Sequence, residues 1–244
     1  MIEGMYTAAA GMAAQQARLD AVANDLANAN TTAYKSNRVA FRDLLYQKPG
    51  LGAGDGVMIG SGSAATSLGR NMTAGSIQQT QRPLDVALQG PGFLQVTGLN
   101  GKPALTRDGN LAIDSKGRIT LSSGEVLSPK ITIPKGVNES DITIGNDGTV
   151  MAKDKKLGTL NIVEVRSPGQ LQPAANNTFT TGPESGTATK AKMTTIAPAS
   201  LEQSNTDAST AMVGMIEAQR AFQLASRAIK IQDQSWEIAN QVKR

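Results

Sequence analysis

The chain has 244 residues and a mass of 25.4 kDa, with 24 Lys and Arg against 20 Asp and Glu, and it contains neither His nor Cys. The length allows a sizeable hydrophobic core, whereas the missing residue types exclude Ser-His-Asp and Cys-His nucleophiles, the usual zinc sites, a haem axial His and disulfides. The net charge of +4 is spread along the chain and aromatic residues make up only 3% of it, which argues against a nucleic-acid groove with stacking platforms.

The N-terminal residues predict a long helix over about 3–29. Apolar side chains recur there in steps of three and four with one polar interruption, which is the heptad pattern of a helix that packs along one stripe. No Lys or Arg precedes Arg18 and no apolar run reaches the length of a membrane span, so we expect neither a cleaved signal peptide nor direct membrane insertion. The stripe consists of Met5, Ala8, Met12, Gln15, Leu19, Val22, Leu26 and Ala29.

Residues 31–75 are predicted to form an extended, Gly-rich connecting segment. The helix is expected to end in the Asn- and Thr-rich stretch 28–32, whose side chains compete for backbone hydrogen bonds. Seven glycines between residues 50 and 69 are typical of an extended or flexible connection. Four basic residues also surround one acid here, and we expect this cluster to be a solvated face. The cluster consists of Lys35, Arg38, Arg42 and Lys48 around Asp43.

Residues 60–65 match the G-x-G-x-x-A fingerprint of dinucleotide-binding proteins, and Asp85 follows about 20 residues later. The fingerprint requires a strand before it and a helix after it. Only a short apolar stretch precedes the motif, and Gly69, Gly75 and Pro83 would interrupt a helix. The sequence therefore argues against a nucleotide site, and we expect no cofactor and no small-molecule substrate.

Residues 76–200 are predicted to form a central antiparallel β domain. Short runs of alternating hydrophobicity are separated by turn dipeptides such as Asn100-Gly101 and Asp147-Gly148. The Pro-, Thr- and Gly-rich stretch 167–200 is expected to be irregular, and a fragment 76–200 is expected to fold alone as a soluble monomer. The expected strands are Leu84–Leu88, Phe93–Val96, Leu111–Ile113, Arg118–Leu121, Ile131–Ile133, Ile142–Ile144, Thr149–Met151 and Leu160–Val165.

Five carboxylates in this β region offer the remaining route to an enzyme. Asp108 and Asp147 each precede Gly in a turn, where Asp is favoured because it bonds to nearby backbone. A glycosidase would need two carboxylates in one cleft. We expect neither a catalytic nor a metal site among the five, which are Asp85, Asp108, Asp114, Asp141 and Asp147.

The C-terminal residues predict a second long helix over about 207–242. Residues 205–207 supply an N-cap, and the apolar pattern again steps by four and three. A second apolar stripe lies beside the first, which indicates that this helix contacts more than one neighbour. The first stripe is Ala211, Met215, Ala218, Phe222, Ala225, Ile229, Gln232, Trp236 and Ala239, and the second is Leu224, Ala228, Ile231, Ile238 and Val242.

The two helices imply an α+β fold that assembles with other copies. Helices of roughly 40 and 50 Å exceed the diameter of about 33 Å of a 100-residue domain, so the β domain cannot cover both. We expect the terminal helices to pair as a coiled coil and to leave an apolar stripe that other copies bury, and either Leu19→Asp or Phe222→Asp to abolish assembly. A secreted β-domain binding module, dimerised by its helices, is the alternative. The candidate subunit-interface residues, which could equally pack within one chain, are Met5, Met12, Leu19, Val22, Leu26, Met215, Phe222, Ile229 and Trp236.

Motifs in three parts of the chain appear in a fixed order. The first part, 20–35, is a heptad helix that ends in an Asn-rich turn followed by an aromatic residue and a Lys, and residues 41–47 continue it. Further motifs occupy 85–96 and 106–110 in the centre, and 201–205 and 215–222 in the C-terminal part. Together they resemble the flagellar basal-body rod and hook protein family, and residues 41–47 are most similar to its distal rod branch. The motif residues of the first part are Asn24, Asn28, Asn30, Thr31, Thr32, Tyr34 and Lys35.

One position departs from the family pattern. The family has Gly after the Asn-Thr-Thr turn, whereas this chain has Ala33. Because Ala has a Cβ, a positive φ is less favourable for it than for Gly, which puts a positive φ at this position in question.

The resemblance implies a structural subunit of the bacterial flagellar distal rod, a helical tube that transmits torque across the cell envelope. It implies terminal helices in an inner tube (1–30 plus 201–244), a segment 31–75 that bridges neighbouring subunits, and an outer β domain (76–200). The implied partners are further copies of the chain, other rod and hook axial proteins, and the flagellar type III export apparatus. The implied location is the basal body, in the periplasm or cell wall, after export without a cleaved signal peptide.

Overall fold

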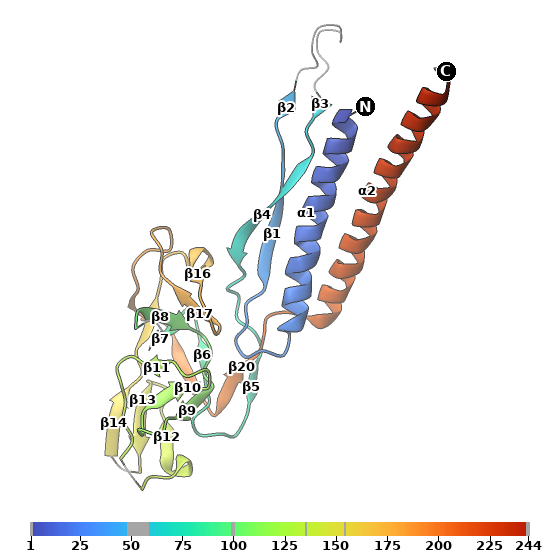
Figure 1. Cartoon of the computed structure of the whole chain (residues 1–244). Coiled ribbons are helices and arrows are strands. Elements are labelled where there is room, and N and C mark those ends of the chain that lie inside the picture. Colours follow the sequence, from blue (N-terminus) through green and yellow to red (C-terminus); the bar gives the residue numbers. More distant parts are fainter. Residues whose placement is uncertain (1, 48–58, 99–100, 135, 154, 243–244) are drawn as a thin grey trace. The chain divides into compact units, whose positions relative to one another are not determined.

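The computed structural model describes residues 2–47, 59–98, 101–134, 136–153 and 155–242. The chain divides into two compact units (Figure 1). Unit 1 comprises Met1–Ala27, Asn37–Leu68 and Asp207–Arg244, and unit 2 comprises Asn28–Ser36 and Gly69–Thr206.

Unit 1 contains the two long helices, α1 (Ile2–Ala27) and α2 (Ala208–Val242), which pack against each other. They run antiparallel, because Gly4 lies against Gln232, whereas Val22 near the other end of α1 lies against Gly214. The predicted N-cap is confirmed at Asp207, whose Oδ1 accepts the Thr210 N–H at 2.7 Å.

Two pairs of strands complete unit 1. The strands are β1 (Asn37–Asp43), β2 (Tyr46–Gln47), β3 (Ile59–Gly60) and β4 (Ser63–Arg70), of which β1 pairs with β4 and β2 with β3. These strands lie along α1, on the side away from α2 (Figure 1). The approach is close because Gly62 has no side chain: a Cβ there would lie 3.1 Å from the Ala10 Cβ. Thr7 Oγ1 also donates to Gly60 O at 3.2 Å.

Unit 2 is built from antiparallel strands. A nine-stranded sheet has the order β16-β17-β8-β7-β11-β10-β9, with β15 pairing to β7 and β18. A three-stranded sheet has the order β12-β13-β14, and two further pairs are β6 with β19 and β5 with β20. The bounds are β5 (Ile77–Gln79), β6 (Val86–Gln89), β7 (Phe93–Thr97), β8 (Pro103–Thr106), β9 (Leu111–Ile113), β10 (Ile119–Leu121), β11 (Val126–Leu127), β12 (Ile142–Ile144), β13 (Thr149–Ala152), β14 (Lys155–Thr159), β15 (Ile162–Glu164), β16 (Gln172–Pro173), β17 (Thr178–Thr180), β18 (Thr189–Lys190), β19 (Thr195–Pro198) and β20 (Ser200–Glu202), with short 3-10 turns at Glu139–Asp141 and Pro168–Gln170.

The core of unit 2 consists of two clusters. The larger joins apolar side chains of β6, β7 and β9–β13, and the smaller is centred on Phe93 and Phe179, whose rings meet edge to face at 6.3 Å between centroids. Both phenylalanines are fully buried. The predicted antiparallel β region therefore has the core that its alternating pattern indicated.

Two predictions about strands are wrong. Residues Ile131–Ile133 form no strand, because only an isolated bridge joins Thr132 to Arg118. The stretch 167–200, expected to be irregular, contains β16–β19, since its residues pair with strands far away in sequence, for example Phe179 with Leu105.

Candidate assembly interface and the segment after the first helix

The predicted interface residues lie along the sides of α1 and α2 where the helices meet. Val22 contacts Gly214, Ala218 is fully buried, and Arg18 pairs with Glu217 at 3.0 Å. Trp236 is 36% exposed, and the other eight predicted residues are half-buried in the single chain. Contacts of these nine residues with another copy remain a prediction; the eight are Met5, Met12, Leu19, Val22, Leu26, Met215, Phe222 and Ile229.

A second apolar surface lies on the opposite side of α2. At about 100° per residue, its members point roughly 120–160° away from Ala218, the fully buried residue of the first stripe. We name this surface the outer face of α2. It consists of Val213 (56% exposed), Leu224 (65%), Ile231 (63%) and Ile238 (61%).

The strands of unit 1 also expose apolar side chains. Phe41 on β1, Leu45 between β1 and β2, and Leu68 on β4 are exposed. Arg38 and Arg42 on β1 are exposed as well. For these two arginines the predicted solvated face is confirmed, whereas Lys48 lies outside the described residues.

For Lys35 the solvated-face prediction is wrong. Its side chain is 0% exposed, and its Nζ donates to Glu202 Oε1 at 2.5 Å and to Thr73 O at 2.7 Å. Burial lowers the pKa of the Lys35 ammonium below its usual 10.5, while the Glu202 carboxylate opposes this shift by favouring the charged form. The local charge pattern could not reveal this burial, because Glu202 lies 167 residues further along the chain.

Glu202 also contacts a second buried cation. Arg107 Nη1 lies 3.6 Å from Glu202 Oε1, and the Gly75 N–H donates to the same oxygen at 2.9 Å. Arg107 is held by the backbone oxygens of Gly90 and Gly92 and lies over the Phe93 ring at 5.6 Å. We name Lys35, Glu202 and Arg107 the buried charge cluster; no local pattern in the sequence predicts it.

Thr32 and Tyr34 of the family motif are structural in unit 2. Thr32 Oγ1 donates to Asp108 Oδ1 at 3.0 Å. The buried Tyr34 ring lies 5.2 Å below the Arg70 guanidinium, and Tyr34 O accepts the Asn205 N–H at 3.2 Å.

The asparagines of the motif lie in and just after α1. Asn24 is exposed on α1, and Asn30 is exposed in the turn that follows the helix. Asn28 Oδ1 accepts the Thr31 hydroxyl at 3.1 Å. These residues therefore lie in the last turns of α1 and in the turn that follows it.

Ala33 adopts a positive φ of 52° even though it is not Gly. The residue is buried, and its N–H donates to Glu202 O at 2.8 Å. Ala33 therefore adopts the positive φ that its Cβ had put in question.

Asp25 is a further structural residue that the sequence analysis did not single out. This buried carboxylate near the end of α1 accepts both the backbone and the side-chain N–H of Asn37, at 3.0 and 3.1 Å. It thereby fixes the start of β1 against α1.

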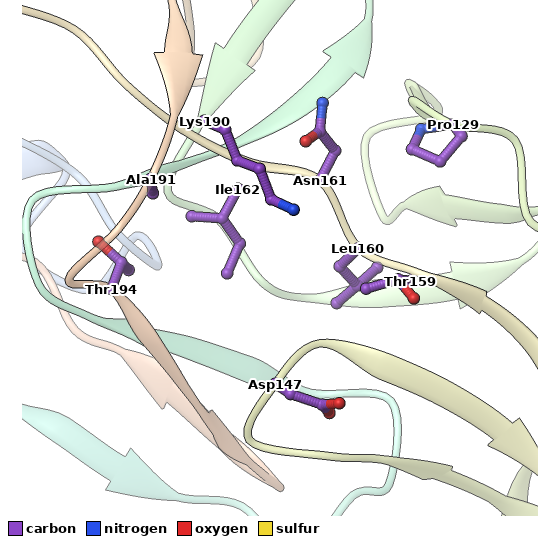
Figure 2. Close-up of a pocket in the computed structure, with 9 residues that line it drawn as sticks. All are labelled: Pro129, Asp147, Thr159, Leu160, Asn161, Ile162, Lys190, Ala191 and Thr194. Atoms are coloured by element: carbon purple, nitrogen blue, oxygen red, sulfur yellow. The ribbon is translucent and has the colours of Figure 1, made fainter.

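Unit 2 contains a pocket of about 450 Å³ lined by Pro129, by Asp147 in the β12–β13 turn, and by residues of the segments 159–162 and 190–194 (Figure 2). Three of its polar side chains are engaged within the fold: Asp147 accepts two bonds from Thr149, Thr194 accepts the Gly92 N–H, and Asn161 donates to Gln95. One carboxylate lines it, so the pocket lacks the carboxylate pair of a glycosidase.

Other chemical sites receive no support from the described residues. No group of three or more Asp or Glu side chains among them is placed to hold a metal ion. The residues that follow Gly62 form strand β4, so the helix that the dinucleotide fingerprint requires is missing. Neither α1 nor α2, over the part described, combines the length and apolarity of a membrane span.

Comparison with known proteins gives matches over most of the chain. Residues 5–35 match the family described as flagella basal body rod protein, residues 87–152 the flagellar hook protein FlgE/F/G D1 domain, and residues 197–242 the flagellar basal body rod FlgEFG protein C-terminal.

Individual relatives match over their full length. The flagellar basal-body rod protein FlgG of Caulobacter vibrioides is 33% identical, over 99% of this chain and 100% of the relative. The protein of the same name from Borreliella burgdorferi is 34% identical over 100% of both chains. The flagellar hook-basal body complex protein FlhP of Bacillus subtilis is 30% identical, also over 100% of both.

Proposed function

This chain belongs to the flagellar basal-body rod protein family, and from that premise we propose that it is a distal rod subunit that assembles with copies of itself through the outer face of α2. The family is structural, so the chain is a structural protein of the basal body and not an enzyme. Placement in the distal part of the rod is supported by the resemblance of residues 41–47 to the distal rod branch of the family.

The observation that carries the proposal is the apolar character of two opposite sides of α2. One side contacts α1 within the chain, and the other exposes more than half of each of four large side chains. A soluble monomer seldom exposes such a line of apolar residues. A neighbouring copy that covers the outer face of α2 would stabilise the assembly by about 25 cal/mol for each Å² of apolar surface that it removes from water.

The proposal extends to the arrangement of copies. The outer face of α2 and the exposed residues Phe41, Leu45 and Leu68 are different surfaces, so contact between one and the other on the next copy is heterologous. Heterologous contacts generate an open helix when the rotation does not close. We propose that such contacts build a helical tube around coiled-coil pairs of terminal helices, and that this tube transmits torque.

Partners and location belong to the same proposal. Other rod and hook axial proteins would continue the tube at its ends, and the subunit would reach the envelope through the flagellar type III export apparatus without a cleaved signal peptide. The similarity of the terminal segments 5–35 and 197–242 to the rod family supports shared axial contacts.

The test places a charge on the outer face without disturbing the contact between α1 and α2. We expect Leu224→Asp and Ile231→Asp to leave the helix content of the dilute protein unchanged and to abolish polymers, because an unpaired charge in an apolar contact costs several kcal/mol, on the order of 3–5. Sedimentation and electron microscopy over a concentration series measure the polymers. Gln219→Asp, an exposed α2 position outside this face, is the matched control.

The outcomes separate the proposal from its alternatives. Normal polymers from both outer-face variants would overturn the assembly surface. Growth of the wild-type protein that stops at dimers would instead support the binding module dimerised by its helices. Leu19→Asp and Phe222→Asp, at half-buried positions of α1 and α2, are expected to lose both the helix pairing and the polymers.

A further inference from the structure

We propose that the buried charge cluster of Lys35, Glu202 and Arg107 is a latch that makes the folding of unit 2 depend on both ends of its sequence. The two ends are Asn28–Ser36 and the β20 region, residues 200–206. This proposal concerns folding and stands independently of the assembly surface on α2.

The geometry brings three distant segments to one carboxylate oxygen. Glu202 Oε1 accepts from Lys35 at 2.5 Å and from the Gly75 N–H at 2.9 Å, and Arg107 Nη1 lies 3.6 Å away. The side chains of Lys35, Glu202 and Arg107 are at most 3% exposed. The three charged groups are therefore shielded from water.

The charges explain why β20 is required. Lys35 and Arg107 are both cations, and Glu202 is the carboxylate that contacts them. Without Glu202 the fold would enclose two positive charges with no counter-ion, which costs much more than the pair itself contributes. Unit 2 is therefore not stable in its folded form before residue 202 takes its place.

The segment 28–36 is required for a different reason. Lys35 supplies the shortest bond to Glu202 and also satisfies Thr73 O. The backbone adds to this connection, because Ala33 N–H donates to Glu202 O at 2.8 Å and Ser36 N–H donates to Asn205 Oδ1 at 2.8 Å. Removal of the segment would take the Lys35 ammonium from Oε1 and the Ala33 N–H from the backbone oxygen of the buried Glu202.

One physical consequence is an order of events. Residues 28–36 precede the strands of unit 2 in the chain, and Glu202 belongs to the last of them. A chain that enters a compartment from one end presents nearly all of unit 2 before the latch can close. Unit 2 therefore stays open until both ends are present.

The experiment is hydrogen exchange with mass readout on the full-length protein, kept dilute. In Lys35→Met we expect amides of β6 and β7 in the unit 2 core to exchange at least about tenfold faster than in wild type, because local opening becomes more populated. Glu202→Gln is expected to have a larger effect, since it leaves two cations. Lys116→Met, an exposed lysine of unit 2, is the control and is expected to match wild type.

Two results would overturn the latch. One is faster amide exchange in peptides of 28–36 together with unchanged exchange rates in β6 and β7, which would show that the core of unit 2 is stable without this segment. The other is unchanged exchange everywhere in Lys35→Met.

A double variant distinguishes charge pairing from simple loss of packing. If the pair acts through charge, Glu202→Gln accelerates exchange less in the Lys35→Met background than in wild type, since only one cation then remains. Additive effects would refute pairing. If Glu202→Gln does not fold, the comparison of Lys35→Met with Lys116→Met still decides the proposal.

Discussion

At the scale of single residues, Ala33 combines a positive φ with complete burial. The left-handed conformation brings the Cβ close to the next carbonyl oxygen, and a β-branched side chain makes this crowding worse. We expect Ala33→Val to destabilise unit 2 by at least about 2 kcal/mol, and Ala33→Gly to change its stability by less than about 1 kcal/mol, because relief of strain and loss of a buried methyl group oppose each other. Urea unfolding measures both, and a well-tolerated Val would contradict the assigned conformation.

Asp108 gives a prediction about pH. Burial raises the pKa of its carboxyl above the usual 3.8, opposed by bonds from Asn110 and Thr32 and reinforced by Asp85. A raised carboxyl pKa means that the ionised form is less favourable in the folded protein than in the unfolded one, so this destabilisation is absent below pH 3.8 and complete above the folded-state pKa.

We therefore expect Asp108→Asn to raise the thermal midpoint at neutral pH and to lose this advantage as the pH falls toward 3.8. The Asn Oδ1 can still accept the bonds from Thr32 and Asn110, both of which go to Asp108 Oδ1. Melting curves between about pH 3.5 and 7 measure the effect, because this range runs from just below the ordinary carboxyl pKa to neutral pH. An equal midpoint at neutral pH would show that the ionised Asp108 is not destabilising.

The burial of Lys35 shows what a local pattern misses. Its sequence neighbours Arg38 and Arg42 are exposed as predicted, but Lys35 pairs with Glu202, which no local spacing connects to it. Charge runs predict solvation only on average, and a single long-range carboxylate reverses the outcome.

At the scale of secondary-structure elements, α1 is packed on two sides. One side contacts α2, and the other contacts Gly60 and Gly62 through Thr7 and Ala10. We expect Gly62→Ala to destabilise unit 1 by about 1–3 kcal/mol, because the new Cβ meets α1 at 3.1 Å and the φ of +97° disfavours it.

Gly11 provides the matched control for this change. Gly11 lies on α1 itself, and a Cβ added there meets no neighbouring atom within 4 Å. Gly11→Ala is therefore expected to stabilise the helix by up to about 1 kcal/mol. Thermal melting followed at a helical wavelength measures both variants. Equal changes in melting temperature for the two variants would show that Gly62 is not in close contact with α1 in solution.

The sequence predicted best those elements in which the apolar pattern extends over many residues. The helices, predicted at about 3–29 and 207–242, are Ile2–Ala27 and Ala208–Val242. Strands with clear alternation, such as Leu111–Ile113 and Ile142–Ile144, also agree. A two-residue strand such as Thr189–Lys190 is too short to show an alternating pattern. It forms because it pairs with β15, a strand from another part of the sequence.

At the scale of the whole molecule, the chain passes between its two units at residues 27/28, 36/37, 68/69 and 206/207. This division changes what we expect of isolated fragments. A fragment 76–200 lacks both Lys35 and Glu202 and would leave Arg107 buried without its carboxylate. A fragment 28–206 keeps all three.

We expect the fragment 28–206 to unfold cooperatively in urea at a higher midpoint than 76–200, which the sequence alone suggested would be self-sufficient. The midpoints are measured by circular dichroism at a β-sheet wavelength. Equal midpoints would show that the ends of unit 2 contribute nothing to its stability, and 76–200 would then be the folding unit.

The position of Trp236 has a practical consequence. It is the only tryptophan of the chain, it lies on α2, and in the single chain its side chain is still partly in contact with water. Indole emission moves to shorter wavelength when water is removed from the ring. Trp236 points to the same side of α2 as Ala218, so the natural protein carries an intrinsic fluorophore that reports, in stopped-flow emission and without any added label, whether another copy also covers this side of the helix during assembly.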